Sequence, residues 1–429
     1  MKIQELRTTH RWLLYSLIVA ILLRLLFILI VDPHPTFAGG DVDWYLTNGL
    51  QLVHNIAPPL QPAPVFLVYV GLVQLIFPAD TATTVQRLRL LNIVWHALMI
   101  IGVYILANRY FDRRVAGMAA FVIAINPIFI IECGQPLTES LFIGLLFPTL
   151  ALYALCQSSP TLRWMGVLGV LFGLATLTRA VLLLFPVILL IHLIRLHGWK
   201  NGLRFGAVLM ITYALTVSTW TIYNALRWNR FIVGAEGIAA FTWMGIHGQA
   251  GPQQVDSAVG NPATDAQRNQ ALASQVWDTL AHNLPGYLEA RLENIAGAYL
   301  QPHSTTYFPG ASLKEMAASW LRSDRSLNGL ATLLQADAFW PKLTLYVFHF
   351  GALILGIVGM VLCWRKFWLA LPLVGYFLYT TAVHSVLLAL PRYLFPVQPV
   401  LIVFASVTVL ATMPAFSRRR RPIADAASG

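Results

Sequence analysis

The stretch Gly39-Gly40-Asp41-Val42-Asp43-Trp44-Tyr45 decides how this sequence is interpreted, because it places two carboxylates directly after an apolar segment. That segment, Leu13 to Val31, is close to the roughly 20 apolar residues that a helix needs to cross a bilayer. Only 11% of the residues are charged, so two aspartates this close together are unusual. We predict that these carboxylates belong to a catalytic site.

The composition indicates a helical integral membrane protein. Of the 429 residues, 57% are hydrophobic, and the mean hydropathy is +0.66, whereas a water-soluble surface needs about 25% charged residues. Several apolar stretches are long enough for spanning helices, and the short alternating segments of an outer-membrane barrel are not seen. The three cysteines have no CxxC spacing and no nearby histidine pair, so they indicate neither a disulfide framework nor a metal site.

The distribution of charge predicts the topology. The formal net charge is +11, but the basic residues gather in short breaks between apolar stretches, which the positive-inside tendency assigns to the cytoplasm. We therefore expect no nucleic acid as a partner. The long polar region 224–340 holds seven basic and nine acidic residues and is expected outside. The sequence contains no Asn-x-Ser/Thr sequon, which favours a prokaryotic cell (inner) membrane.

Eleven apolar stretches are candidate spans. If all of them crossed, the later basic clusters would lie on the wrong side. Residues 62–78 are the stretch that we expect not to cross, because it is short, follows a proline-rich entry and ends at Pro78; it would lie at the outer interface or dip in and out. We therefore predict an all-α polytopic bundle of about ten transmembrane helices plus interfacial helices, with both termini in the cytoplasm.

This topology divides the chain into four regions and places the Asp41 stretch on the outer face. The spacings Gly169-x-x-x-Gly173 and Gly356-x-x-Gly359 indicate close helix packing. The regions are an N-terminal transmembrane catalytic module (1–223, including the first outer loop 32–87), a small extracytoplasmic loop or capping region (224–340, with expected helices at 264–282 and 288–300), the C-terminal transmembrane helices (341–416) and a basic cytoplasmic tail (417–429).

Asp41 is the first candidate catalytic residue. If the chain after Gly40 is helical, Asp41 and Tyr45 share a face, while Asp43 is turned by roughly 200° from Asp41. Both aspartates can then point at one substrate only if Asp41 lies at the helix cap, and capping alone is the alternative role for Asp41. A carboxylate here can act as general base toward an acceptor hydroxyl.

Two glutamates flank the second outer turn. Thr138-Glu139 at a helix start is typical of capping and of dipole compensation, whereas Glu132, at the end of the preceding span, has a weaker structural explanation. Either side chain could orient the acceptor or a divalent ion, and Glu139 is our preferred catalytic candidate. A divalent metal, if one takes part, would be held by Asp41 and Glu139.

Several cationic residues are candidates for binding phosphate. Arg24 lies within the first span, roughly 10 Å from its outer end, where an arginine is costly and indicates either function or an ion pair inside the bundle. Arg179 and Arg392 lie at outer ends of spans, where an arginine can bind phosphate oxygens or extend to lipid headgroups. We favour phosphate binding for Arg392, with His384 as a companion.

Some nucleotide and hydrolase motifs are missing from the sequence. There is no P-loop, no GxGxxG motif after a strand, no GxSxG elbow and no HExxH motif. A cytosolic nucleotide-sugar or ATP site is therefore not expected. A substrate that carries phosphate should come from the membrane.

The chain resembles the GT-C glycosyltransferases, specifically the protein O-mannosyltransferases and the aminoarabinose transferases that act on lipid A. The matching motifs run through the whole chain, and the large outer loop matches least. In order, they are Gly40-Asp41-x-x-x-Tyr45, Pro58-Pro59-Leu60, Arg89-Leu90-Leu91-Asn92, Asn126-Pro127, Thr138-Glu139, Gly173-Leu174-Ala175-Thr176-Leu177-Thr178-Arg179, Trp220-Thr221-Ile222-x-Asn224 and Arg392-Tyr393-Leu394-x-Pro396.

The resemblance implies a transferase that takes a sugar from a polyprenyl-phosphate donor and passes it, with inversion, to an acceptor on the outer face. Asp41 is then the acidic residue of the first outer loop and the general base. The family often has Asp-Glu at this point, whereas Val42 follows Asp41 here, so Asp43 is the candidate for the second carboxylate.

The resemblance also implies residues that bind substrate. Tyr45 and Tyr393 lie in matching motifs and are expected to contact it. Tyr223 stands where many relatives have an arginine before asparagine, so Arg227 is the candidate for that contact. The sugar and the acceptor, whether glycan, lipid or protein, stay open.

Two other functions fit the sequence. One is a transporter or flippase for a lipid-linked solute, for which Arg24 in the first span is the supporting feature. The other is a non-catalytic scaffold of the cell envelope, which the altered Asp-Glu pair leaves open.

Overall fold

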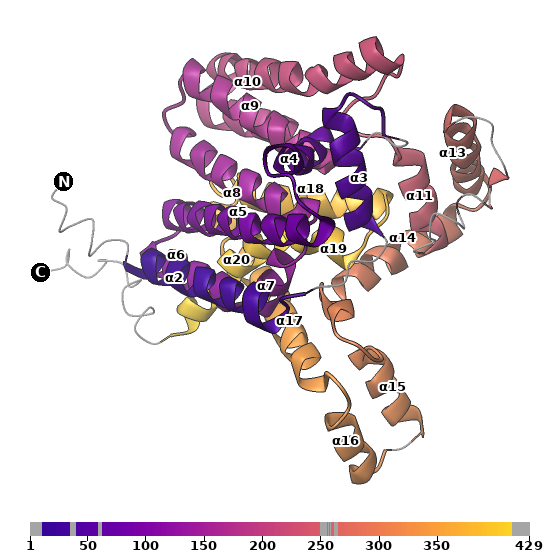
Figure 1. The fold of residues 1–429 in the computed structure, drawn as a ribbon. Coiled ribbons are helices and arrows are strands. Elements are labelled where there is room, and N and C mark those ends of the chain that lie inside the picture. The colour runs from indigo at the N-terminus through magenta and orange to yellow at the C-terminus, as the bar shows by residue number, and fades with distance from the viewer. Residues whose placement is uncertain are drawn as a thin grey trace, which may run out of the picture.

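The computed structural model describes residues 11–34, 40–58, 62–248, 255, 257, 259–260, 265–323 and 325–413. These residues form α-helices, short 3₁₀ turns and one π-helical turn, and no β-strand occurs among them. Figure 1 shows a bundle of long helices, with the helices of the 224–340 region lying along one side. The predicted all-α class is confirmed.

Among the described residues, ten apolar helices form the bundle. They are α2 (Arg11–Leu26), which continues into the π-helical turn η1 (Phe27–Val31), α5 (Thr81–Tyr110), α6 (Arg113–Ile125), α7 (Pro127–Cys133), α8 (Thr138–Cys156), α9 (Leu162–Thr178), α10 (Phe185–Trp228), α17 (Phe339–Leu362), α18 (Leu371–Val386) and α20 (Gln398–Thr412).

Capping residues and breaks set the ends of these helices. Asp80 caps α5 by accepting a hydrogen bond from Thr83 N at 2.9 Å. Asn126 caps α7 in the same way, next to a proline that favours a helix start, and α6 and α7 meet at 57°. Inside α10, Gly198 has a φ of +76°, which glycine adopts at little cost. The helix is therefore broken into two arms at this residue.

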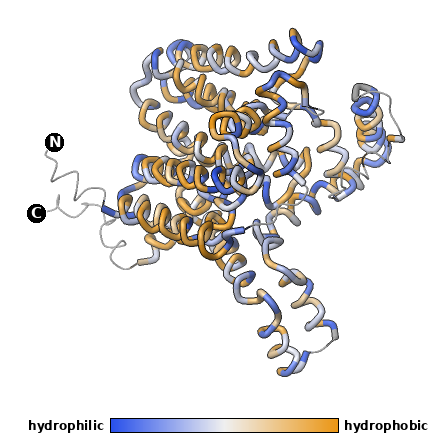
Figure 2. The backbone as a smooth tube through the Cα atoms, viewed as in Figure 1, coloured by the Kyte–Doolittle hydropathy of each residue, from blue (hydrophilic) through white to orange (hydrophobic). Residues whose placement is uncertain are grey.

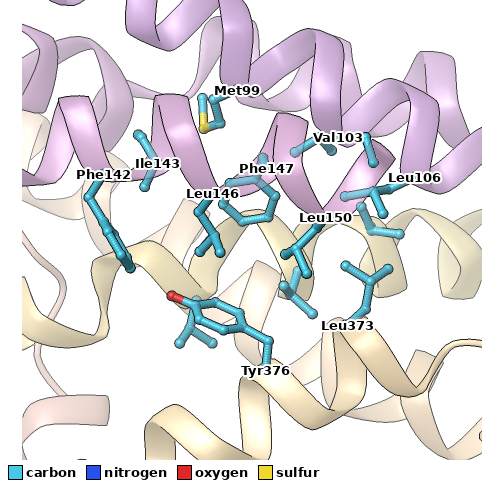
Figure 3. Close-up of a cluster of buried hydrophobic side chains, with 14 of the residues drawn as sticks. Met99, Val103, Leu106, Phe142, Ile143, Leu146, Phe147, Leu150, Leu373 and Tyr376 are labelled. Carbon is cyan, nitrogen blue, oxygen red and sulfur yellow. The ribbon is translucent and has the colours of Figure 1, made fainter. Parts of the chain in front are cut away.

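The centre of the bundle is a layer of interdigitated apolar side chains from α5, α8 and α18. Figure 3 shows Met99 and Val103 of α5 beside Phe147 of α8, with Tyr376 of α18 on the opposite side. All four side chains are almost fully buried. Burial of this kind fixes the relative positions of the helices that carry the polar residues described below.

The two glycine spacings noted in the sequence lie at helix contacts. A Cβ atom at Gly169 would clash with α10 at Leu209 and Thr212, and one at Gly359 would clash with Phe404 of α20. Small residues let helix backbones approach this closely. The predicted close packing is confirmed.

The length and composition of the helices make this an integral multi-pass membrane protein. Among the described residues, six helices are long and apolar enough to cross a membrane, or seven if the bent pair of α6 and α7 counts as one span. Helix α9 has only 17 residues, and α10 is broken at Gly198, so the predicted number of about ten spans stays a prediction. Residues Pro64–Ile76 form α4, about 20 Å long, which is less than the roughly 30 Å hydrocarbon core and fits a helix that does not cross.

Seven further helices complete the described part of the chain, and α13 and α15 are the most polar among them (Figure 2). They are α3 (Asp41–Val53), α11 (Ile238–His247), α13 (Asp265–His282), α14 (Leu284–Tyr299), α15 (Leu313–Ser323), α16 (Leu327–Leu334) and α19 (Pro391–Leu394). The two helices predicted in the 224–340 region correspond to α13 and α14, although α14 begins four residues earlier than expected.

The predicted region boundaries fall inside helices. Residue 223 lies within α10, which continues to Trp228, and residue 340 lies within α17, which begins at Phe339. The division into regions stays a prediction. The predicted basic tail, 417–429, lies outside the described residues.

Candidate active site

Four segments that are far apart in the sequence meet at one end of the bundle. They are the first turn of α3, the turn between α7 and α8, the residue after α9, and α19. α2 begins and α20 ends at the opposite, left-hand end of the bundle in Figure 1. The sequence predicted that these four segments share one face.

Glu139 is the centre of this meeting point. It lies in the first turn of α8 and is fully buried. Its Oε1 atom accepts hydrogen bonds from Arg179 Nη1 and from Arg392 Nε, the latter at 2.6 Å, and its Oε2 atom accepts from Arg392 Nη2 at 3.3 Å. The α8 N-cap is Leu137, with no side-chain cap bond, so the Glu139 carboxylate fixes two arginines.

Asp41 completes the cluster from the solvent side. Its Oδ2 atom accepts a hydrogen bond from Arg392 Nη1 at 2.5 Å, and its side chain is 59% exposed, whereas that of Glu139 is 0% exposed. The N-cap of α3 is Gly40, with no side-chain cap bond, so the capping alternative does not describe Asp41. Arg392 is therefore held between a buried carboxylate and an accessible one.

Tyr45 and Asp43 share the helix that presents Asp41. Tyr45 packs edge-to-face on Phe66, with 4.9 Å between ring centroids. Burial raises the pKa of Tyr45 far above its usual range, and the positive charge of Arg392 opposes this shift. The Tyr45 hydroxyl thus stays protonated near the cluster. Asp43 lies in the same first turn and is half-buried.

An aromatic wall backs the two arginines. The Arg179 guanidinium lies 5.4 Å from the ring centroid of Tyr393, within the range of a cation–π contact. The His384 ring stacks on the Tyr393 ring, with 5.6 Å between the ring centroids. His384 Nδ1 lies 3.0 Å from Leu388 O, and its Nε2 is buried without a hydrogen-bond partner among the described residues. His384 thus orients Tyr393 and does not contact the carboxylates directly.

Glu132 has a partner that the sequence did not suggest. Its Oε2 atom lies 2.5 Å from Nε2 of His303, a residue in the segment after α14. Glu132 is almost fully buried. His303 lies in the least matched part of the chain and belongs to no motif, so the sequence did not mark it.

The turn between α7 and α8 is held by residues of α5. Arg89 Nε donates to Gly134 O at 2.9 Å, and Asn92 Nδ2 donates to Gln135 O at 2.8 Å. Arg89 also forms an ion pair with Asp32 at 2.9 Å. The Arg89-Leu90-Leu91-Asn92 motif therefore positions the two glutamates by binding the backbone between them.

Two of the predicted residues lie elsewhere. Arg24 is fully buried and donates to Ala20 O and Ala124 O, both at 3.1 Å, and to His96 Nδ1 at 3.3 Å. We considered an ion pair for Arg24, but in the described part of the chain its guanidinium donates to backbone carbonyls and to His96 instead of to a carboxylate. Arg227 donates to Asn55 Oδ1 at 3.1 Å, beyond the far end of α3 and about 20 Å along the helix from Asp41.

The donor atoms do not form a ready metal site. The carboxylate oxygens of Asp41 and Glu139 that were candidates for a divalent ion face arginines instead. No group of three or more His, Cys, Asp or Glu side chains within the described residues could hold a metal ion. We derive no chemical step through a metal.

Comparisons with known proteins identify the fold. Residues 61–223 match the sequence profile of the family described as dolichyl-phosphate-mannose-protein mannosyltransferase. The chain resembles the solved Archaeoglobus fulgidus oligosaccharyltransferase in its apo form, with 15% identity and a TM-score of 0.53 over 93% of this chain and 50% of that one. The archaeal oligosaccharyltransferase AglB from Archaeoglobus fulgidus, in complex with an inhibitory peptide and a dolichol-phosphate, gives 14% identity and a TM-score of 0.51 over 93% of this chain and 50% of that one.

A third structure, ArnT from Cupriavidus metallidurans bound to undecaprenyl phosphate, has 15% identity and a TM-score of 0.41 over 94% of this chain and 79% of that one. The chain spans about half the length of the oligosaccharyltransferase. No curated protein sequence matched the chain. The polytopic helical bundle has the GT-C glycosyltransferase fold, and residues 61–223 carry the match to the mannosyltransferase family.

Proposed function

We propose that this protein transfers a sugar from a polyprenyl-phosphate donor to an acceptor hydroxyl on the extracytoplasmic face of the membrane. The observation that carries the proposal is the cluster of Asp41, Glu139, Arg179 and Arg392 at one end of an apolar bundle. This cluster contains an accessible carboxylate, which can take a proton, and two arginines, which can hold phosphate oxygens.

The family match and one structural relative support the donor class. The matched family is described by its use of dolichyl-phosphate mannose, and the archaeal oligosaccharyltransferase was solved with a dolichol-phosphate. A lipid-borne phosphate fits a site at the end of membrane helices, because its prenyl chain can stay in the bilayer while its headgroup reaches Arg392.

Charge balance suggests how the donor enters. The two arginines and the carboxylates of Asp41 and Glu139 together are neutral. A sugar–phosphate–prenyl diester carries one negative charge, so it can replace Asp41 on Arg392 without leaving a net charge. Asp41 is the exposed partner of Arg392 and Glu139 is the buried one. Asp41 is therefore the carboxylate that the donor displaces from Arg392. Donor binding thereby frees the group that acts as general base.

The chemical step is then a direct displacement. Asp41 removes the proton of the acceptor hydroxyl as its oxygen attacks the anomeric carbon, and the bond from that carbon to the phosphate oxygen breaks. One attack from the side opposite the phosphate inverts the configuration. The departing phosphate gains charge, which Arg392 and Arg179 stabilise in the transition state.

The test is release of polyprenyl phosphate. Purified protein in liposomes is given the polyprenyl-phosphate sugars extracted from membranes of the host, together with a membrane extract as the source of acceptor. We expect the wild type to release free polyprenyl phosphate, detected by mass spectrometry, and Asp41→Asn to be slower by about 10²- to 10⁴-fold, the usual contribution of a general base. Asn55→Ala, just beyond the far end of α3, serves as the control variant.

Two results would contradict the proposal. If the wild type releases no polyprenyl phosphate from any donor in the extract, a transporter or scaffold accounts for the chain better. If Asp41→Asn keeps the wild-type rate, Asp41 is not the base.

A further inference from the structure

The contact between His303 and Glu132 joins the outer segment to the candidate active site and has no role in the mechanism above. Glu132 Oε2 and His303 Nε2 lie 2.5 Å apart, and the Glu132 side chain is only 1% exposed. The other carboxylate oxygen, Oε1, is buried with no hydrogen-bond partner in the described part of the chain. His303 is thus the hydrogen-bond partner of this buried carboxylate, which would be costly to bury without one.

The segment that carries His303 is fastened to the bundle on both sides. Before it, His349 Nε2 lies 2.8 Å from Tyr299 O, the last residue of α14. After it, Lys342 Nζ donates to the carbonyls of Pro309, Gly310 and Ala311 at 2.7 to 3.0 Å. His303 is therefore presented by a segment of fixed position.

His303 lies next to the residues that we assign to phosphate binding. Its ring packs on Phe395, with 5.1 Å between centroids, and Phe395 follows Arg392 by three residues, or about one helical turn. The charge of His303 in turn acts on Glu139 and His349, which places both side chains near it. Glu132, Glu139, His349 and the nearby Arg392 are the ionisable groups around it.

One ring nitrogen of His303 is available for substrate. Nε2 is engaged by Glu132, and Nδ1 makes no hydrogen bond to any described residue. The side chain keeps 12% of its surface exposed. A protonated ring in this state can donate from Nδ1 to an oxygen that enters the site.

We propose that His303, oriented by Glu132, is the general acid of the transfer, a role that rests on the proposed function. As the bond between the anomeric carbon and the phosphate oxygen breaks, its electron pair stays on that oxygen, which takes the proton from His303 Nδ1. Asp41 receives the acceptor proton, so one proton enters and one leaves the protein in each turnover. The polyprenyl phosphate departs as the protonated monoester.

The experiment measures release of polyprenyl phosphate from the extracted lipid-linked sugars by His303→Ala, His303→Gln, Glu132→Gln and the wild type. We expect both His303 variants to be slower by at least about 100-fold, as for loss of a general acid, with affinity for undecaprenyl phosphate within about threefold of the wild type. Added imidazole should restore part of the rate of His303→Ala, because it can deliver the missing proton. Glu132→Gln should reduce the rate less than either His303 variant, because the imidazole is still present.

The matched control is His349→Ala, which removes an imidazole that holds the same segment but faces a carbonyl instead of a carboxylate. It should lose less activity and gain nothing from imidazole. The inference is overturned if His303→Ala keeps the wild-type rate within about fivefold, if imidazole restores nothing, or if His349→Ala behaves identically. A wild type that releases no polyprenyl phosphate overturns the proposed function itself, which is a separate result because it needs no variant.

Discussion

Two arginines of this protein, Arg24 fully buried and Arg392 half-buried, have hydrogen-bond partners of different kinds. Arg392 donates to two carboxylates, one buried in α8 and one exposed at the start of α3. Arg24, within α2, donates to three backbone carbonyls and to His96, and no carboxylate in the described part of the chain bonds to it. Arg392 thus has a partner, Asp41, that another anion can replace, whereas the partners of Arg24 cannot be replaced.

The kind of acceptor separates an arginine that can bind another anion, Arg392, from an arginine that holds helices together, Arg24. A carbonyl in a helix cannot move away from an arginine, so Arg24 joins α2 to the end of α6 permanently. The Asp41 side chain can rotate into solvent, so Arg392 can accept another anion at little cost. For these two residues, the nature of the hydrogen-bond acceptor therefore distinguishes a candidate binding role from a structural one.

The largest expected effect is at Arg392. Arg392→Lys keeps the charge but cannot span Asp41 and Glu139 with its donors. We expect release of polyprenyl phosphate to fall by about 10²- to 10³-fold, the usual cost of removing a group that stabilises the transition state. The same substitution at Arg24 is the matched control. A lysine at 392 with more than a tenth of the wild-type rate would contradict the role of Arg392.

A smaller effect is expected at Arg24, and on stability instead of rate. Arg24→Met leaves the carbonyls of Ala20 and Ala124 and the His96 ring without their donor, which should cost about 1–3 kcal/mol. Thermal unfolding in detergent should therefore begin at a lower temperature, while the rate per folded molecule stays within about threefold of the wild type. A 100-fold loss of rate with unchanged unfolding would show that Arg24 takes part in the reaction.

The smallest effect is expected at Arg227, which the resemblance suggested as a substrate contact. Its partner is Asn55 at the far end of α3, so Arg227→Ala should change the transfer rate by less than about threefold, since exposed contacts contribute little. Rates of the two proteins measured side by side with the same donor extract check this. A loss comparable to that of Arg392→Lys would mean that the substrate extends along α3.

Much of the fold and part of the candidate site could be predicted from the sequence. Hydropathy and the placement of basic residues indicated the helical bundle, and the order of the outer turns indicated that Asp41, Glu139, Arg179 and Arg392 share one face. This works because consecutive spans reverse direction, so alternate turns meet at the same end of a bundle.

The rest depended on tertiary contacts that no local pattern records. The partner of Glu132 is His303, which is 171 residues away in the chain, in a segment with no motif. Arg227 was assigned by alignment with a motif, yet α3 carries its partner Asn55 away from Asp41. Sequence spacing alone gave no acceptor for Arg24, since backbone carbonyls have no signature in the sequence.

The central claim is that a lipid phosphate takes the place of Asp41 on Arg392. Affinity for undecaprenyl phosphate, measured on the wild type, Asp41→Asn and Arg392→Lys in the same detergent, tests it most directly. If Asp41 competes with the ligand, removing its charge should tighten binding by about five- to tenfold, because the competent state is no longer only partly populated, while Arg392→Lys should weaken it. Equal or weaker binding by Asp41→Asn would contradict the exchange.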